Sequence, residues 1–331
     1  MNFLSYILWN PDLLALQIGP IGLRWYSLCW LVGLMAAFFY VKKIFSDERI
    51  PDAKFEPLFI YCFIGILVGA RLGHCVFYQP DYFLTSATGW FEMFIPVKLF
   101  GEGVIDSLSS GHWKFIGYEG LASHGGTLGL MLALLLYSRK MKLPLLFLID
   151  AIAIATPVTA CAIRIGNLMN SEIIGKPTDL PWAFIFERVD SIPRHPGQLY
   201  EAIAYAILGV IMYVIYKKTS PQKTTAAVRT DFKAQKKVAG QNNGGNTLIG
   251  RGFYFGLCLF YIFTARIFIE LTKEDQEAFE ADMLLNMGQL LSLPFIAMAI
   301  YVLWRAARGS FPIGVPATKS HNANKSKTKR K

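Results

Sequence analysis

The chain has 331 residues, of which 53% are hydrophobic, and a mean hydropathy of +0.37. A soluble protein of this length would need more polar surface to cover its core, so the composition excludes an ordinary soluble domain. The formal net charge is +10, but the basic residues lie between apolar stretches and form no stripe interleaved with aromatics. This distribution argues against nucleic acid as a partner.

Apolar stretches of about 20 residues, the length that crosses roughly 30 Å of hydrocarbon, recur along the chain. In chain order they predict membrane-spanning helices at residues 23–42, 57–79, 121–138, 144–162, 199–216, 251–271 and 287–305. The predicted fold is an all-α polytopic membrane protein of about seven transmembrane helices. Residues 1–310 form its single transmembrane domain.

The segments between these stretches alternate in charge. Basic residues follow the first, third, fifth and seventh stretches, and acidic residues follow the second and sixth. Because Lys and Arg collect on the cytoplasmic side of membrane proteins, the N-terminus is predicted outside and the C-terminus in the cytoplasm. Residues 84–118 are then an outer loop, residues 219–250 a disordered cytoplasmic insert, and residues 311–331 a basic cytoplasmic tail.

Ionisable and polar residues gather at one level of the predicted bundle. Arg71, Arg164 and Arg266 lie in the outer portions of the second, fourth and sixth stretches, where an intramembrane charge indicates function by default. Tyr26, His124 and the polar segment 195–201 mark the outer beginnings of the first, third and fifth stretches. Six stretches therefore bring polar groups to the outer level.

The fourth stretch ends in a segment dense in hydrogen-bonding groups. Arg164 there is suited to a bidentate contact with a phosphate or carboxylate, and Asn167 and Glu172 follow closely enough to orient it. The alternative is a buried Arg–Glu pair that only locks two helices together. Arg266 and Glu270 share a helix face at i,i+4 spacing, and the same two interpretations apply to them.

His124 opens the third stretch and is followed by Gly125 and Gly126. Imidazole is suited to proton transfer near neutral pH, and glycines leave room for a ligand beside it. A structural role for a single histidine at a helix start is the alternative. The histidines and cysteines have none of the spacings that bind metal, and no phosphate-binding or dinucleotide motif is present, so no metal or cofactor is expected.

Several ordered blocks between residues 24 and 294 resemble a known family. They are Arg24-Trp25-Tyr26, Gly69-Ala70-Arg71-Leu72-Gly73, His124-Gly125-Gly126, Arg164 through Glu172, Arg194 through Glu201, Arg266 to Glu270, and Met287-Gly288-Gln289. Together they are similar to bacterial prolipoprotein diacylglyceryl transferases, and the block that begins at Arg164 matches the family signature.

The resemblance implies transfer of the diacylglyceryl group of phosphatidylglycerol to the lipobox cysteine of a prelipoprotein. It implies a thioether product, release of glycerol phosphate, and an inner-membrane enzyme whose active site faces outward. It also implies functional roles for the residues that match the family's own, which are Tyr26, His124, Arg164, Asn167, Glu172, Arg266 and Glu270. One departure is Ile262, which stands where the family usually has Tyr, with Tyr261 beside it.

The residue types suit this reaction. Arg164 and Arg266 are predicted to bind the phosphate, oriented by Asn167, Glu172 and Glu270, with Arg71, Tyr261, Gly125 and Gly126 as further substrate-binding residues. A thiol of pKa about 8.5 needs help to ionise at neutral pH, and His124 or Tyr26 would provide it. A transporter for an anionic lipid is the main alternative, although no internal repeat is evident. A purely structural scaffold would leave the clustered charges unexplained.

Overall fold

A computed structural model describes residues 6–18, 21–101, 103–115, 120–220, 248–274 and 285–308. Within them the chain is mostly helical, and the long helices are α1 (Trp25–Asp47), α2 (Asp52–Phe77), α6 (Ser123–Met141), α7 (Leu145–Asn170), α8 (Gly197–Thr219), α10 (Phe253–Glu270) and α11 (Met287–Ala307). Most of the predicted insert and the predicted basic tail lie outside the described residues.

Six of the long helices are apolar and long enough to cross a membrane, namely α1, α2, α7, α8, α10 and α11. The predicted polytopic helical architecture is therefore confirmed. The third predicted stretch does form helix α6, but its polar first turn and the Arg139 and Lys140 of its last turn place it outside that set. A seventh crossing remains a prediction.

Short strands, which the all-α prediction did not include, flank the helices. A parallel pair of β1 (Ile7–Trp9) and β6 (Phe184–Phe186) is extended by the antiparallel β7 (Pro193–Arg194), and we call these three strands the head sheet. A hairpin of β2 (Leu14–Ile18) and β3 (Ile21–Arg24) leads into α1. Strands of two to five residues are too short for their alternation to be recognised in a sequence.

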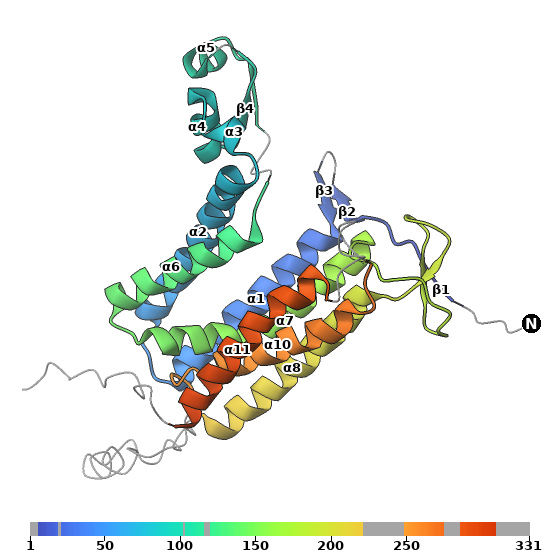
Figure 1. Ribbon diagram of the computed structural model, residues 1–331. Coiled ribbons are helices and arrows are strands. Elements are labelled where there is room, and N and C mark those ends of the chain that lie inside the picture. Colours follow the sequence, from blue (N-terminus) through green and yellow to red (C-terminus); the bar gives the residue numbers. More distant parts are fainter. Residues whose placement is uncertain are drawn as a thin grey trace, which may run out of the picture.

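The described residues of the predicted outer loop, together with the four residues before it, fold into a small subdomain that continues from the end of α2, and we call it the arm (Figure 1). Its elements are α3 (Pro80–Phe83), α4 (Ala87–Phe94), β4 (Val97–Leu99), α5 (Val104–Ser109) and β5 (Trp113–Phe115). Met93 and Phe83 of the arm pack with Cys75 of α2 in a separate buried cluster. The arm is therefore attached to the end of a predicted membrane span.

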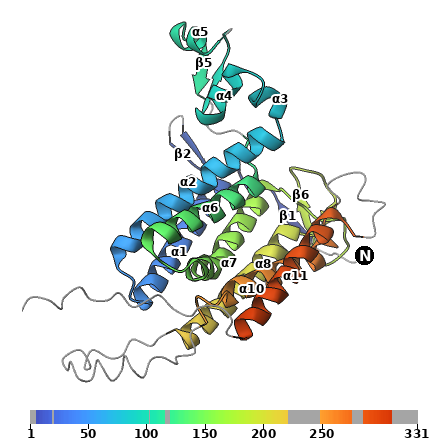
Figure 2. The same cartoon turned by 60° about the vertical axis from the view of Figure 1, so that its left-hand side comes forward.

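The main buried cluster lies at the end of the bundle far from the arm, which we call the core end. It joins the last turns of α1 to the first turns of α2 and α7 through residues such as Phe45, Phe55 and Leu148. Helix α1 packs along α7 and α10 along α11, whereas α2 and α6 form a pair that diverges from the others away from the core end (Figures 1 and 2). The opposite, polar end is thus left open for the charged residues.

The α2–α6 pair is held together by glycines at four-residue spacing. Gly65, Gly69 and Gly73 of α2 face Gly125 and Gly129 of α6, and a Cβ at any of these positions would overlap atoms of the other helix. Small residues at such spacing allow two helix backbones to approach closely inside a membrane. The contact with α2 therefore requires glycine at position 125.

Gly129→Ala is expected to lower the midpoint of thermal unfolding in detergent, because its Cβ would collide with the carbonyl oxygen of Gly65. Overpacking of this kind costs about 1–3 kcal/mol. Gly209→Ala in α8 is the matched control, since its Cβ would stand 3.6 Å from the nearest atom, in ordinary contact. Equal unfolding midpoints for the two variants would contradict the close packing of α2 on α6.

The start of α10 is fixed by a buried carboxylate on α7. Asp150 accepts hydrogen bonds from the backbone N–H groups of Gly250, Gly252 and Phe255 at 2.8, 2.9 and 3.0 Å. These donors are the last residue of the predicted insert and two residues that follow it, and helix-start N–H groups otherwise lack partners. The start of α10 is therefore anchored on α7.

Candidate active site

The signature residues at the polar end of α7 form one hydrogen-bonded chain. Arg164 donates through Nη1 to Oδ1 of Asn167 at 3.2 Å, and Asn167 donates through Nδ2 to Oε2 of Glu172 at 2.9 Å. Asn170 donates to the other carboxylate oxygen of Glu172 at 3.0 Å. The structure thus brings together the three residues that the sequence predicts to cooperate.

The backbone around Glu172 is strained. The residues on either side, Ser171 and Ile173, have φ angles of 56° and 59°, a region that a β-branched side chain rarely adopts. The side chain of Gln198, fully buried at the start of α8, donates to the carbonyl oxygen of Glu172 at 2.5 Å. Strain of this kind persists where surrounding contacts enforce it, and it clusters at functional sites.

Arg164 is also one end of a chain of ion pairs that crosses three helices. Its Nε lies 2.7 Å from Oε2 of Glu201 on α8, and the other oxygen of Glu201 accepts from Nζ of Lys273 at 3.0 Å. Lys273 also reaches Glu270 of α10 at 3.1 Å, and Glu270 lies 3.8 Å from Nε of Arg266. We call these five residues the charge network.

The charge network is buried at its centre and accessible at its ends. Glu201, Glu270 and Lys273 are each at most 5% exposed, whereas the side chains of Arg164 and Arg266 are 23% and 38% exposed. Within these five residues three cations face two carboxylates, which leaves one positive charge in excess, and the third carboxylate nearby, that of Glu172, is joined to Arg164 only through Asn167 and is exposed to solvent. Two partly accessible guanidinium groups with excess positive charge form a site for an anion.

Arg266 retains unused hydrogen-bonding capacity. Its Nε is buried and has no hydrogen-bond partner within the part of the chain that the structure describes. Tyr205, buried on α8, lies close to both Arg164 and Arg266, so the two guanidinium groups border one region. A buried, unpaired donor is costly unless a ligand satisfies it.

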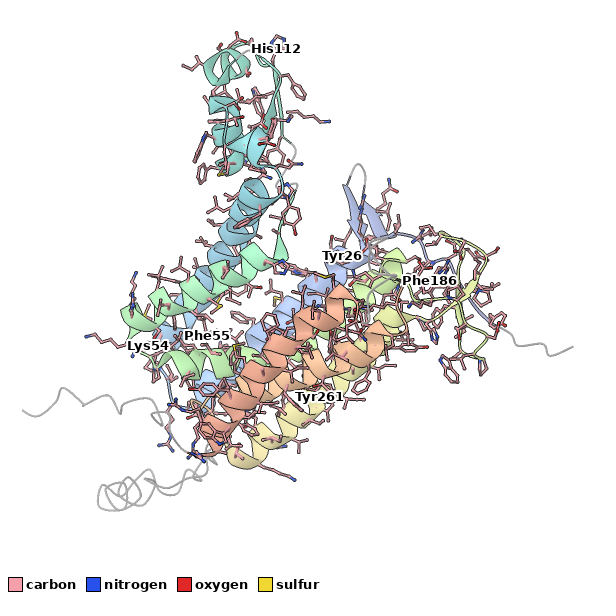
Figure 3. The ribbon with its side chains drawn as sticks, in the orientation of Figure 1. Tyr26, Lys54, Phe55, His112, Phe186 and Tyr261 are labelled. Atoms are coloured by element: carbon pink, nitrogen blue, oxygen red, sulfur yellow. The ribbon has the colours of Figure 1, made fainter. Side chains whose placement is uncertain are left out.

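Tyr26 lies beside the Arg164 turn. A Cβ on Gly166 would stand 3.0 Å from its ring atom Cδ2, so Gly166 allows α1 to approach α7 there. Figure 3 shows Tyr26 near the polar end of the bundle and Tyr261 much nearer its middle. Tyr261 packs against the main buried cluster, which sets it apart from the charge network.

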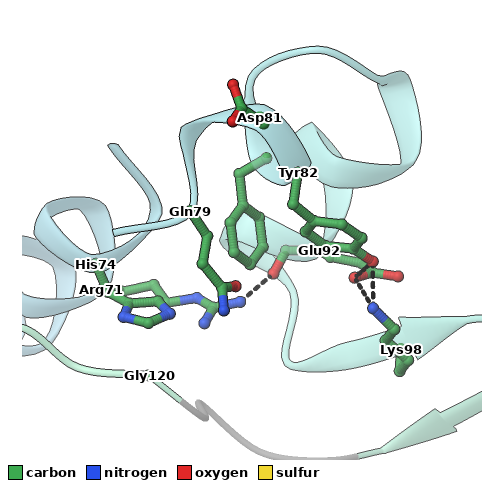
Figure 4. A pocket seen from close by; sticks show the side chains of 9 residues that line it. Arg71, His74, Gln79, Asp81, Tyr82, Glu92, Lys98 and Gly120 are labelled. Carbon is green, nitrogen blue, oxygen red and sulfur yellow. Dashed lines mark hydrogen bonds and ion pairs between the residues drawn. The ribbon is translucent and has the colours of Figure 1, made fainter. Parts of the chain in front are cut away.

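Arg71 has a different environment from the other two arginines. It is buried, and it donates to the backbone carbonyl oxygens of Glu92 at 2.8 Å and Met93 at 3.3 Å, with Phe83 beneath its guanidinium. These contacts attach the arm to α2. Arg71 also lines a separate cavity of about 690 Å³, seen in Figure 4 with His74 and Gln79 beside it. A substrate-binding role for Arg71 remains a prediction.

His124 is exposed in the first turn of α6, within the diverging α2–α6 pair. Gly125, which follows it, is packed tightly against α2, whereas a Cβ on Gly126 would make only an ordinary contact with α2. Gly125 therefore serves helix packing and the imidazole of His124 is accessible, while substrate-binding roles for Gly125 and Gly126 remain predictions. Among the described residues, no group of three His, Cys, Asp or Glu side chains is placed to hold a metal ion.

Two central members of the charge network, Glu201 and Lys273, were not among the site residues predicted from the sequence. Glu201 belongs to the polar segment 195–201, which the sequence predicts to lie at the same level of the bundle as the arginines. Lys273 stands next to an acidic segment. Its spacing of three residues from Glu270 could have predicted the ion pair between them. Their meeting with each other depends on tertiary contacts.

The head sheet lies beside the same end of α7. Trp9 of β1 donates through its indole N–H to the carbonyl oxygen of Leu168 at 2.8 Å. Arg194 of β7 forms ion pairs with Asp190 and Glu274, and its hydrogen bonds to Asp190 lower the pKa of that carboxyl group. The head sheet thereby connects α7 to the segment that carries Lys273.

The fold and the site together define a polytopic membrane protein with two partly accessible arginines, joined by a chain of ion pairs, at one end of its helices. A family model described as prolipoprotein diacylglyceryl transferase matches residues 13–232 and 241–305. The chain belongs to the prolipoprotein diacylglyceryl transferase family.

Similar proteins include three named phosphatidylglycerol–prolipoprotein diacylglyceryl transferase. The one from Bacteroides fragilis is 50% identical over 303 residues, which cover 92% of this chain and 96% of that protein. The one from Tolumonas auensis is 35% identical and covers 91% of this chain and 98% of its own length. The one from Porphyromonas gingivalis is 33% identical, with 93% and 97% covered.

Proposed function

We propose that the protein transfers the diacylglyceryl group of phosphatidylglycerol to the lipobox cysteine of prelipoproteins. In this reaction the bond between the phosphate oxygen and the carbon of the diacylated glycerol breaks, and that carbon forms a bond with the cysteine sulfur. The thiol proton is lost and glycerol phosphate leaves. The observation that carries the proposal is the excess positive charge of the charge network, which suits a phosphate that gains negative charge as it leaves.

Arg164 and Arg266 bind the phosphate and stabilise the charge that develops on it. Asn167 and Glu172 orient Arg164 through the hydrogen-bonded chain at the end of α7, and Glu270 orients Arg266. Nε of Arg266, which makes no hydrogen bond within the described part of the chain, provides a donor for a phosphate oxygen. His124 or Tyr26 assists loss of the thiol proton.

An apolar groove supports a lipid as the substrate. It has a volume of about 290 Å³ and lies between α1, α2, α6 and α7, where the diverging α2–α6 pair leaves space. Its lining extends along α7 from Ile152 to Ile163, the residue before Arg164. An acyl chain in this groove places its glycerol end next to the arginine that binds the phosphate.

A transfer assay separates this function from the transporter alternative. Purified protein in detergent is incubated with phosphatidylglycerol labelled in its acyl chains and a peptide that contains a lipobox cysteine. The expected product is a labelled peptide that releases its label as fatty acid when the oxygen esters are hydrolysed in alkali and keeps an unlabelled glyceryl group on the cysteine sulfur as a thioether. Binding of labelled lipid without any transfer to cysteine would favour the transporter.

We propose seven crossings of the bacterial inner membrane, with the N-terminus outside, the C-terminus in the cytoplasm, and the polar end of the bundle toward the outer side. The charge alternation of the connecting segments supports this orientation. In a background without native cysteines, a cysteine at Ser109 in the arm is expected to react with an impermeant thiol reagent in intact cells. A cysteine at Lys218, at the far end of α8, is expected to react only after permeabilisation, and the reverse pattern would invert the topology.

A further inference from the structure

Lys273 is a buried cation at the centre of the charge network. It is 4% exposed, and its ammonium group is held between Glu201 at 3.0 Å and Glu270 at 3.1 Å. Each of these carboxylates also faces an arginine, so positive and negative groups alternate from Arg164 to Arg266. Lys273 is therefore the group through which the two arginines are connected.

The position of Lys273 is fixed by contacts with segments outside α10. It follows α10 directly and pairs as an isolated β-bridge with Gly175, and the adjacent Thr272 accepts a backbone hydrogen bond from Lys176 at 2.8 Å. Its aliphatic stem lies over Gly197 at the start of α8, where a Cβ would stand 3.4 Å from Cγ of the lysine. Three segments of the chain thus hold this one ammonium group in place.

The distances indicate what the ammonium group does to Arg266. Glu270 lies closer to Lys273, at 3.1 Å, than to Arg266, at 3.8 Å, and Nε of Arg266 is left without a hydrogen bond among the described residues. A carboxylate with no lysine beside it would be drawn to the arginine, because a buried charge without a partner is costly. Lys273 therefore competes with Arg266 for Glu270.

The same argument applies to Arg164. Glu201 is completely buried, and its carboxylate lies between Nε of Arg164 and Nζ of Lys273. Without Lys273, the network would contain two cations and two carboxylates, and its excess positive charge would be lost. The attraction of the site for an anion depends on that excess.

We infer that Lys273 is a positioning residue that holds Glu201 and Glu270 so that Arg164 and Arg266 remain available to the phosphate of the lipid substrate. The inference rests on the proposed function for the identity of that anion. Lys273 itself touches only the two carboxylates and does not contact the reacting atoms.

The test compares Lys273→Met, which keeps the aliphatic stem and removes the charge, with Lys273→Arg, which keeps the charge. For each variant the KM is measured separately for dioctanoyl phosphatidylglycerol and for a lipobox peptide, together with the Kd for the lipid in the absence of peptide. Lys43→Met is the control, because Lys43 pairs with Asp47 at the core end of α1.

Lys273→Met is expected to raise the KM and the Kd for phosphatidylglycerol about tenfold or more, as loss of a charged partner usually does. The KM for the peptide is expected to change by less than about twofold, and Lys273→Arg to recover most of the lipid affinity. A folded Lys273→Met variant with an unchanged KM for lipid, or with equal increases for lipid and peptide, would overturn the inference.

The double variant Glu201→Gln/Lys273→Met covers the case in which the single variant fails to fold, since it removes one charge of each sign. Its lipid affinity is expected to lie closer to that of the parent, and a complete loss of lipid binding in a folded double variant contradicts the inference. If the parent transfers no diacylglyceryl group, the proposed function fails. Selective loss of lipid binding in Lys273→Met would still support the role of Lys273.

Discussion

Replacement of Arg164 by lysine is expected to reduce diacylglyceryl transfer by about 100-fold or more, although the positive charge is kept. The guanidinium group uses Nε for Glu201 and Nη1 for Asn167, on different edges of one rigid plane. An ammonium group is a single point of charge, and it cannot hold both partners in those directions and also present a fixed donor to a phosphate oxygen.

The measurement is the transfer rate at saturating peptide, with the amount of folded enzyme determined independently. Arg305→Lys is the matched control, because Arg305 lies in the last turn of α11 at the core end and donates to Tyr301. Its rate is expected to equal that of the parent. A nearly normal rate for Arg164→Lys would mean that the charge alone matters at this position or that the arginine is structural.

Replacement of His124 by asparagine is expected to slow transfer most at low pH. If His124 is the base that removes the thiol proton, the variant depends on unaided ionisation of a thiol whose pKa is about 8.5. Its rate should then climb as the pH approaches that value, whereas the parent rate levels off near neutrality. The ratio of parent to variant rates therefore falls with rising pH.

A ratio that stays constant from about pH 6 to 9 would exclude His124 as the base and leave it a role in orienting the lipid. His112→Asn is the control, since His112 is exposed on the arm at the far end from the bundle (Figure 3). Tyr26→Phe provides the complementary test. If that variant shows the pH-dependent recovery and His124→Asn does not, Tyr26 takes the proton.

The features of this structure that could be predicted from the sequence are those that depend on residues close together in the chain. Long apolar runs predicted the helices because the length of a run is visible without any knowledge of its neighbours. Arg164, Asn167 and Glu172 were predicted to cooperate because they lie within two turns of one chain segment. Arg266 and Glu270 share a helix face for the same reason, and the structure places them 3.8 Å apart.

The parts that it missed depend on contacts between distant segments. Lys273 meets Glu201 only because the segment after α10 pairs with Gly175, which no spacing in the sequence indicates. Arg71 resembles the other arginines by position in its span, yet the folded arm supplies its partners. The close contact of α2 with another helix could have been predicted, because Gly65, Gly69 and Gly73 have the four-residue spacing of close helix pairs.

The hydrogen bonds that Asp150 accepts from the start of α10 bear on how the polypeptide is connected. They fix the start of α10 to α7, by contacts that do not pass along residues 221–247. Chain continuity at that point contributes a high local concentration of one part for the other, and it does not determine how they fit. The two parts of the chain on either side of residues 221–247 therefore meet through specific contacts, and Asp150 makes those at the start of α10.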